Sequence, residues 1–168
     1  HHWMFSEQHL WGLAGPLFKM NPPLRTPKQV LRLRTLLSRP DFVDTVGTDH
    51  APHTLAEKAA PVYDQVPSGV PGVQTRFGLL FELFYRRKIT LQRFIDLTVR
   101  TAARIFGEKT KGEIAPGYVA DLVLVDPEGI TAFQHETMAS RCGWPPFDGV
   151  IVPGAIRAVV ARGVRIPV

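Results

Sequence analysis

Apolar residues recur at helical spacing after Thr26 and Pro27. The residues that share this face are Val30, Leu33, Leu36 and Leu37. The spacing predicts an amphipathic helix over 27–38. Thr26 is the predicted N-cap, and Pro27 suits the first helical position because its missing N–H has no intrahelical partner to lose.

Further helices are predicted by the same spacing over 73–87, 90–99 and 101–106. The pattern Thr-Leu-Ala-Glu at 54–57 is a capping box, which predicts a brief helix before them. Prolines and glycines crowd the stretch 61–72, so no regular structure is expected there.

Strand patterns lie at two places in the chain. A short apolar run at 42–47 follows the first predicted helix, as expected for half of an α/β repeat. Beyond residue 107 the chain becomes rich in Val and Gly, with β-type runs at 121–125, 149–152 and 155–166. We therefore expect an α/β unit over 1–107 and a β-rich segment over 108–168.

The composition changes this picture little. Among 168 residues the net charge is +5, but the basic residues are scattered over predicted helices, which argues against nucleic-acid binding. No apolar run approaches the roughly 20 residues of a membrane span. The single cysteine, Cys142, excludes an intrachain disulfide and favours the cytoplasm. Because the chain starts at His1, we expect a fragment of a longer protein.

The strongest chemical signal is the block Gly47–His53, which follows the predicted strand at 42–47. A carboxylate at the end of a barrel strand, here Asp49, can hold a metal and take a proton from an attacking water. Asp is also a common turn residue, so Asp49 alone would be weak. His50 and His53 strengthen the case, because imidazole is the usual metal ligand and titrates near neutral pH.

Two loops are weaker candidates. Asn21 is followed by Pro22 and Pro23, so its amide would be a rigid donor and acceptor, although a structural turn is the alternative. The loop 67–72 carries glycines that would let backbone groups approach a ligand, although an ordinary loop explains it too. The neighbouring pair at 1–2, His-His, cannot easily ligate one ion from a strand, and a supporting role is favoured.

Together these motifs resemble the dihydroorotases of the amidohydrolase superfamily, over the C-terminal portion only. The matching segments are His1-His2, Lys19–Arg25, Thr48–His53, Pro67–Gly72, Lys111–Ile114, Gly117–Asp126 and Cys142–Gly149. The combination Asn-Pro-Pro-Leu-Arg followed by Thr-Asp-His-Ala-Pro-His is specific, whereas either half alone would be moderate.

The resemblance implies an α/β fold: the C-terminal part of a metal-dependent (β/α)8 TIM barrel followed by a small β-sandwich segment. It implies reversible cyclisation of N-carbamoyl-L-aspartate to dihydroorotate in pyrimidine biosynthesis, with zinc as cofactor. By motif position Asp49 would be a metal ligand and the proton shuttle. Asn21 and His53 would contact this small-molecule substrate, and the backbone at Pro71 and Gly72 would line its ring.

The sequence also departs from that pattern. The family's other metal ligands have no counterpart, so most zinc ligands are missing and the isolated chain is expected to be inactive. One alternative is another cyclic amidohydrolase of the allantoinase or hydantoinase type, against which Asn21 and His53 argue. Another is a non-catalytic scaffold for aspartate transcarbamoylase. A homo-oligomer is a further option.

Overall fold

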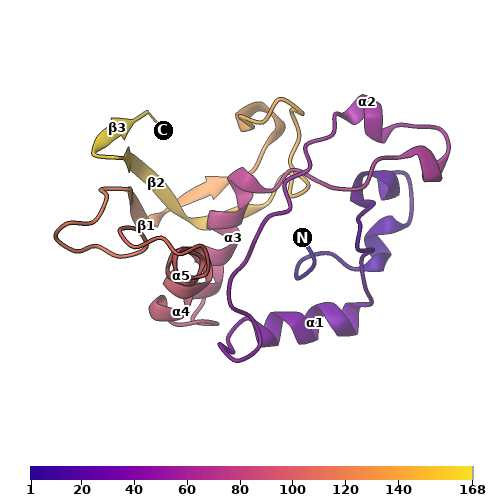
Figure 1. Cartoon of the computed structure of the whole chain (residues 1–168). Coiled ribbons are helices and arrows are strands. Elements are labelled where there is room, and N and C mark those ends of the chain that lie inside the picture. The colour runs from indigo at the N-terminus through magenta and orange to yellow at the C-terminus, as the bar shows by residue number, and fades with distance from the viewer. Residues whose placement is uncertain (168) are drawn as a thin grey trace. The chain divides into compact units, whose positions relative to one another are not determined.

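In the computed structural model, which describes residues 1–167, the chain divides into two compact units (Figure 1). Unit 1 comprises His1–Leu37, Gly47–Arg76 and Ala132–Val150, and unit 2 comprises Ser38–Val46, Phe77–Thr131 and Ile151–Val168. Each unit is therefore built from segments that are far apart in the sequence. The predicted boundary at residue 107 rests on a change of residue pattern along the sequence, not on which segments lie together in space, and it stays a prediction.

Unit 1 contains two capped α-helices. Helix α1 spans Pro27–Leu36, and helix α2 spans Leu55–Lys58. The Thr26 hydroxyl accepts a hydrogen bond from the Gln29 backbone N–H, and Thr54 does the same for Glu57. Both predicted caps are thus confirmed, because each satisfies an N–H that has no partner inside its helix.

Short 3₁₀ turns complete unit 1, at Glu7–Leu10, Gly15–Phe18, Tyr63–Gln65 and His135–Thr137. The expectation of no regular structure over 61–72 is wrong at two points. One is the turn at Tyr63–Gln65, and the other is Val70, which forms an isolated parallel β-bridge with His50. Prolines forbid a long ladder in this stretch, but they leave room for one turn and one bridge.

The core of unit 1 joins the start of the chain to the segment 132–150. Phe5 stacks on Phe147 with ring centroids 4.7 Å apart, and Trp144 is only 2% exposed. Val30 of α1 is buried as well, as its predicted face requires. Cys142 is free and buried.

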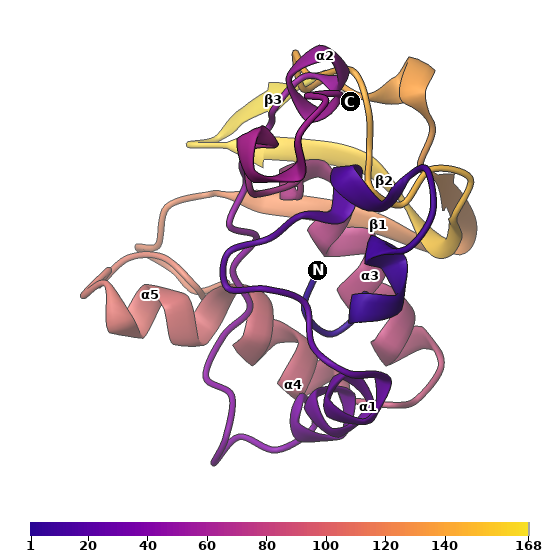
Figure 2. The ribbon, with the colours of Figure 1, turned by 90° about the vertical axis from the view of Figure 1, so that its right-hand side faces the viewer.

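In unit 2 a single helical run replaces two predicted helices. Helix α4 (Leu91–Ile95) continues through a π-helical segment (Asp96–Arg100) into α5 (Thr101–Ile105), and Figure 2 shows them as one rod. The expected break near residue 100 is wrong because the backbone stays in the right-handed helical region at every junction. Thr98, a potential helix breaker, bonds its hydroxyl back to the Phe94 carbonyl at 2.7 Å.

Helix α3 (Val73–Tyr85) contributes phenylalanines to the core of unit 2. Its Phe77 and Phe81 both meet Phe94 of α4 edge-on, with ring centroids 5.5 and 5.8 Å apart. Leu80, next to Phe81 in the sequence, and Leu97, three residues after Phe94, are both fully buried. Edge-to-face rings of this kind stabilise a core beyond their buried area.

The prediction of a strand at 42–47 is wrong, because Phe42 lies in a turn and the residues after it form no strand. Their partners are groups of the helical run: Val46 N–H and the Thr45 hydroxyl both donate to the Leu97 carbonyl, at 3.0 and 2.8 Å. The Arg93 guanidinium also donates to the Val43 carbonyl. A strand needs a neighbouring strand, and within residues 1–167 none lies beside this segment.

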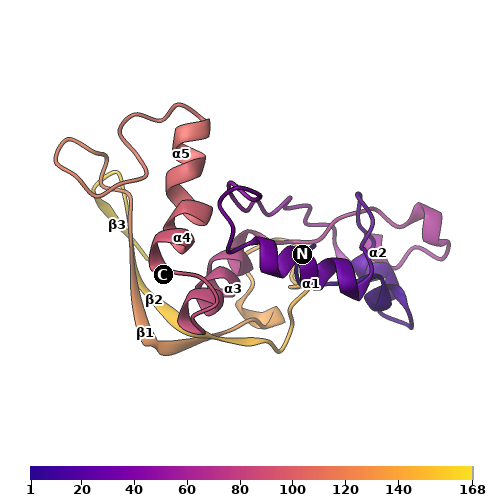
Figure 3. The ribbon, with the colours of Figure 1, turned by 90° about the horizontal axis from the view of Figure 1, so that it is seen from below.

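The β-rich part forms one sheet of order β1-β2-β3, with β1 at Leu122–Ala132, β2 at Ile151–Ala161 and β3 at Val164–Ile166 (Figure 3). The expected run 155–166 is broken by a hairpin in which Val160 pairs with Arg165. Its two turn residues, Arg162 and Gly163, both have positive φ, as a tight hairpin between twisted strands requires.

No helix among the described residues is long and apolar enough to span a bilayer.

Candidate active site

Asp49 lies at a turn of the backbone, directly before a β-bridge. Its φ is 46°, in the left-handed region that Asp adopts more readily than most residues, and its carboxylate is exposed. The next residue, His50, forms the parallel bridge with Val70, and Ala51 N–H donates to the Val70 carbonyl at 3.1 Å. The segment that carries Asp49 therefore runs beside the loop 67–72.

Two glycines make this close approach possible. A Cβ on Gly69 would lie 2.3 Å from the Ala51 Cβ, and the φ of Gly69 is +119°. A Cβ on Gly72 would lie 3.1 Å from the Thr48 Cβ. Only glycine fits at Gly69 without moving its neighbours, so these residues fix how near the two segments come.

Lys58 connects the segment around Lys19 to the loop 67–72. Its side chain is fully buried, and its ammonium donates to the Pro67 carbonyl at 2.8 Å and to the Lys19 carbonyl at 3.4 Å. Gly69 N–H also donates to Lys19 at 2.8 Å. The stretch that carries Asn21 is thereby held against the loop 67–72.

The pKa of Lys58 is lowered to about 8, chiefly because burial disfavours the ammonium form. The charge of Lys19 lowers it further. No carboxylate pairs with Lys58 among the residues described, so its hydrogen bonds are to backbone carbonyls. Burying a charge without an acidic partner costs free energy, and the hydrogen bonds of Lys58 to the two backbone carbonyls offset part of that cost.

His53 is held by a residue far along the chain. The indole N–H of Trp144 donates to the His53 carbonyl at 2.8 Å, and His53 itself is half-buried. Helix α2, capped by Thr54, begins immediately afterwards. The position of His53 is thus set on one side by a helix cap and on the other by the buried Trp144.

His50 has a role that sequence reasoning missed. Its Nδ1 accepts the backbone N–H of Gly72 at 3.0 Å and that of Val73 at 3.4 Å. Val73 is the first residue of α3, so the imidazole satisfies an N–H that the helix leaves without an internal partner. His50 therefore ties the loop 67–72 to the turn at Asp49.

The negative charge of Asp49 acts on the pKa of His2, at the start of the chain. The pKa of His2 is lowered, first because burial disfavours the imidazolium and then because of the neighbouring amino group. Asp49 opposes this lowering, and Arg25 adds to it. His2 therefore lies within electrostatic reach of both the Asp49 carboxylate and Arg25, and the supporting role of the histidine pair stays a prediction.

The structure thus gathers the segments of all five predicted site residues into unit 1. Asp49 and Asn21 are exposed, His53 and Gly72 are half-buried, and Pro71 is buried. Both polar groups of the Gly72 backbone are engaged internally: the N–H by His50, and the carbonyl by Arg76 N–H and the Thr75 hydroxyl. Whether these residues contact a substrate stays a prediction.

The residues present do not by themselves fit a zinc ion. Over residues 1–167 no three His, Cys, Asp or Glu side chains gather closely enough to hold a metal. A zinc site takes three or four protein ligands, and Asp49 is one predicted ligand.

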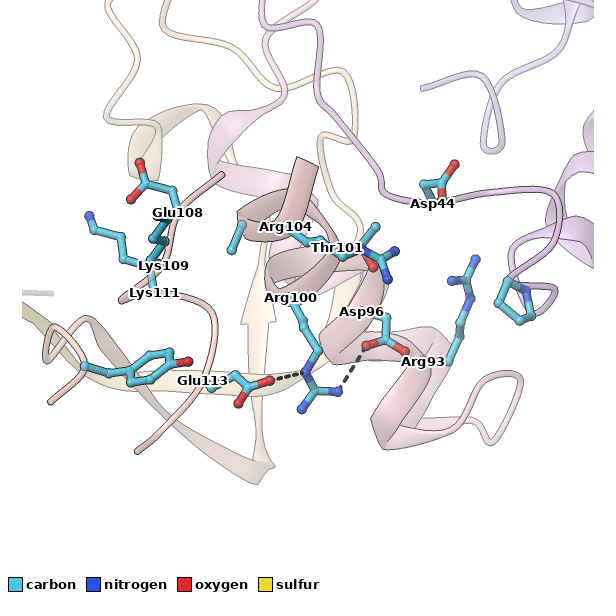
Figure 4. A pocket seen from close by; sticks show the side chains of 13 residues that line it. Asp44, Arg93, Asp96, Arg100, Thr101, Arg104, Glu108, Lys109, Lys111 and Glu113 are labelled. Carbon is cyan, nitrogen blue, oxygen red and sulfur yellow. Dashed lines mark hydrogen bonds and ion pairs between the residues drawn. The ribbon is translucent and has the colours of Figure 1, made fainter. Parts of the chain in front are cut away.

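A cavity of about 590 Å³ in unit 2 contains none of the predicted site residues (Figure 4). At its centre the Arg100 guanidinium pairs with Asp96 and with Glu113, each at 3.2 Å. Lys111, from the same motif as Glu113, pairs with Asp121 at 3.0 Å. Within unit 2, the motif 111–114 thus fastens a loop to the helical run.

Comparison with known proteins places the chain in a family. The model of the amidohydrolase family matches residues 20–166. The chain belongs to the amidohydrolase family. Among curated members, a dihydroorotase of Halobacterium salinarum is 43% identical over 150 residues, and one of Methanosarcina mazei is 36% identical over 151 residues. These matches cover 89% of this chain but only 35% and 33% of those relatives.

Solved structures of this family have the same fold. A D-hydantoinase (dihydropyrimidinase) from Thermus sp. superposes with a TM-score of 0.91 at 30% identity, over 98% of this chain and 37% of that one. The chain thus spans about a third of the length of its relatives. The comparisons confirm the resemblance to dihydroorotases and the predicted fold class, the C-terminal part of an α/β amidohydrolase barrel with a β-rich segment.

Proposed function

We propose that the complete protein containing this chain is a dihydroorotase. It hydrolyses the ring amide of dihydroorotate to N-carbamoyl-L-aspartate and catalyses the reverse cyclisation in pyrimidine biosynthesis. The observation that carries this proposal is the 43% identity to an archaeal dihydroorotase over 150 residues of this chain. A match at this level over most of the chain favours the same reaction more than the fold alone would.

In this proposal Asp49 moves the proton. Its carboxylate takes a proton from the attacking water as the water oxygen bonds to the ring carbonyl carbon. It then gives that proton to the ring nitrogen as the C–N bond breaks, so one water is consumed per ring opened. Its exposure and its place at the turn after an extended segment suit this role.

The substrate contacts follow from the loops gathered around Asp49. Asn21 and His53 would bind polar groups of the substrate, and the backbone at Pro71 and Gly72 would line its ring. Lys58 supports this arrangement because it bonds to the Lys19 carbonyl, two residues before Asn21, and to the Pro67 carbonyl in the loop that carries Pro71 and Gly72.

The cofactor of the complete protein is proposed to be zinc. Asp49 would supply one ligand, and the remaining ligands would come from parts of the protein outside this chain. We also propose a cytoplasmic location, since the one cysteine, Cys142, is free and buried.

Two other functions remain as alternatives. The likeness to D-hydantoinases, at 30% identity in structure and 33% for a D-phenylhydantoinase of Escherichia coli, favours a different cyclic amide as substrate. The second alternative is a non-catalytic scaffold, with aspartate transcarbamoylase as its partner.

A substrate panel with the full-length protein separates these alternatives. We expect kcat/KM for dihydroorotate to exceed that for hydantoin and allantoin by at least about 100-fold, because sites that pair with specific polar groups strongly reject analogues that lack them. Absence of dihydroorotate turnover would refute the proposal. Turnover of hydantoin alone would favour the first alternative. No turnover together with less than one zinc per chain would favour the scaffold.

A further inference from the structure

His50 stands out because the proposed chemistry does not use it, yet it bonds to a loop that does. Its side chain is exposed, so packing does not explain its presence. Its Nδ1 nevertheless accepts two consecutive backbone N–H groups, from Gly72 and Val73. To accept, Nδ1 must be unprotonated, which leaves Nε2 as the donor of the neutral ring.

The segment that carries His50 also holds the loop at Val70, whose carbonyl accepts the Ala51 N–H at 3.1 Å. On its other side the loop 67–72 is fixed by Lys58 at Pro67 and by Lys19 at Gly69. Between these anchors and α3, the Gly72 backbone follows Pro71, whose ring cannot donate a hydrogen bond. The bond from Gly72 N–H to His50 therefore sets where the Pro71–Gly72 peptide lies relative to Asp49, one residue before His50.

We propose that His50 is a positioning residue for the substrate loop. By holding Gly72 and Val73 it fixes the Pro71–Gly72 backbone at the distance from Asp49 at which a ring can lie between backbone and carboxylate. This inference rests on the proposed function of Asp49 and the loop. It adds a residue that acts through the loop and does not touch the substrate.

Three variants of the full-length protein test the acceptor itself. In His50→Asn the side-chain oxygen occupies the place of Nδ1, one bond beyond Cγ, and can accept the same N–H groups. In His50→Gln the acceptor lies one bond too far, and in His50→Leu there is none. The matched control is Thr90→Ala, which removes a cap from α4 in the other unit, where Thr90 accepts Arg93 N–H at 3.1 Å.

We expect KM for dihydroorotate to rise about tenfold in His50→Leu and His50→Gln, because the loss of one hydrogen bond changes an equilibrium constant by about that factor. His50→Asn should stay within about threefold of wild type, a difference below 1 kcal/mol. Thr90→Ala should lower the melting temperature and leave KM unchanged. The proposal would be overturned if KM for dihydroorotate stayed at the wild-type value in all three His50 variants. It would also be overturned if KM rose as much in His50→Asn as in His50→Leu.

Amide hydrogen exchange without substrate separates this inference from the proposed function. We expect faster exchange of the Gly72 and Val73 amides in His50→Leu, and wild-type protection in His50→Asn. If the wild type does not turn over dihydroorotate, the function fails while this readout still decides the positioning. Unchanged protection in His50→Leu would overturn the role of His50 whatever the substrate is.

Discussion

Replacing Lys58 with Met removes a buried ammonium and keeps most of the apolar stem. Two opposing effects follow at neutral pH. The Pro67 carbonyl loses its Lys58 donor, and an unsatisfied buried acceptor costs about 1–3 kcal/mol, whereas the Lys19 carbonyl keeps the Gly69 N–H. The variant also escapes the cost of burying charge, which for a pKa lowered from 10.5 to about 8 is about 3 kcal/mol. At pH 7 the two effects largely cancel.

The cancellation ends as the pH rises. Below pH 8 Lys58 is charged in both the folded and the unfolded protein, so the full cost of burial is present. Between about 8 and 10.5 the folded protein releases the proton first, and the unfolded chain then binds more protons. The free energy of unfolding of the wild type therefore rises with pH in this window, by up to about 1.4 kcal/mol per pH unit. Lys58→Met lacks this rise.

The assay is urea denaturation of the full-length protein at several pH values from 7 to about 10.5, since Lys58 titrates in this window. The difference in unfolding free energy between wild type and Lys58→Met cancels the titration of all other groups. The control is Lys88→Met, which removes a lysine at an exposed position. A flat or falling difference for Lys58→Met would refute the conclusion that Lys58 is buried and charged at pH 7.

Two further substitutions test the packing of the site. Gly69→Ala should destabilise the protein by about 1–3 kcal/mol, because residue 69 has a positive φ and the new Cβ would collide with Ala51. Gly47→Ala is the control: its new Cβ would have no atom within 4 Å, so the melting temperature should change little. Equal melting temperatures would contradict the close approach. Trp144→Phe should cost about 1–3 kcal/mol by leaving the His53 carbonyl without its donor, and should raise KM for dihydroorotate. An unchanged KM would show that His53 does not depend on this bond.

Local signals were predicted well because their physics lies within a few residues. Thr26 and Thr54 cap their helices since an N-cap needs only a side-chain oxygen and the third N–H beyond it. The extended segment at 42–46 was misassigned because strand formation depends on a neighbour. Its actual partners, Leu97 and Arg93, lie on a helix some fifty residues later, and no periodicity reveals them.

The site shows the same limit. Asp49, Asn21 and the loop 67–72 were found from motifs, but the residues that hold them together were not. Lys58 follows Glu57 in a short polar helix, a setting typical of a solvated lysine, and it is buried only because two loops close over it. Trp144, in a Cys-Gly-Trp turn, is the one of these residues whose type and setting hint at a buried side chain with a hydrogen-bond donor.

The central claim is that Asp49 carries the proton in dihydroorotate hydrolysis, and Asp49→Asn in the full-length protein tests it most directly. The amide keeps the shape of the carboxylate but cannot take a proton from water. The matched control is Asp44→Asn, at a second exposed aspartate five residues earlier. We predict that kcat falls by about 10²–10⁴-fold in Asp49→Asn and stays near wild type in Asp44→Asn. Activity of Asp49→Asn within about tenfold of wild type would contradict the account.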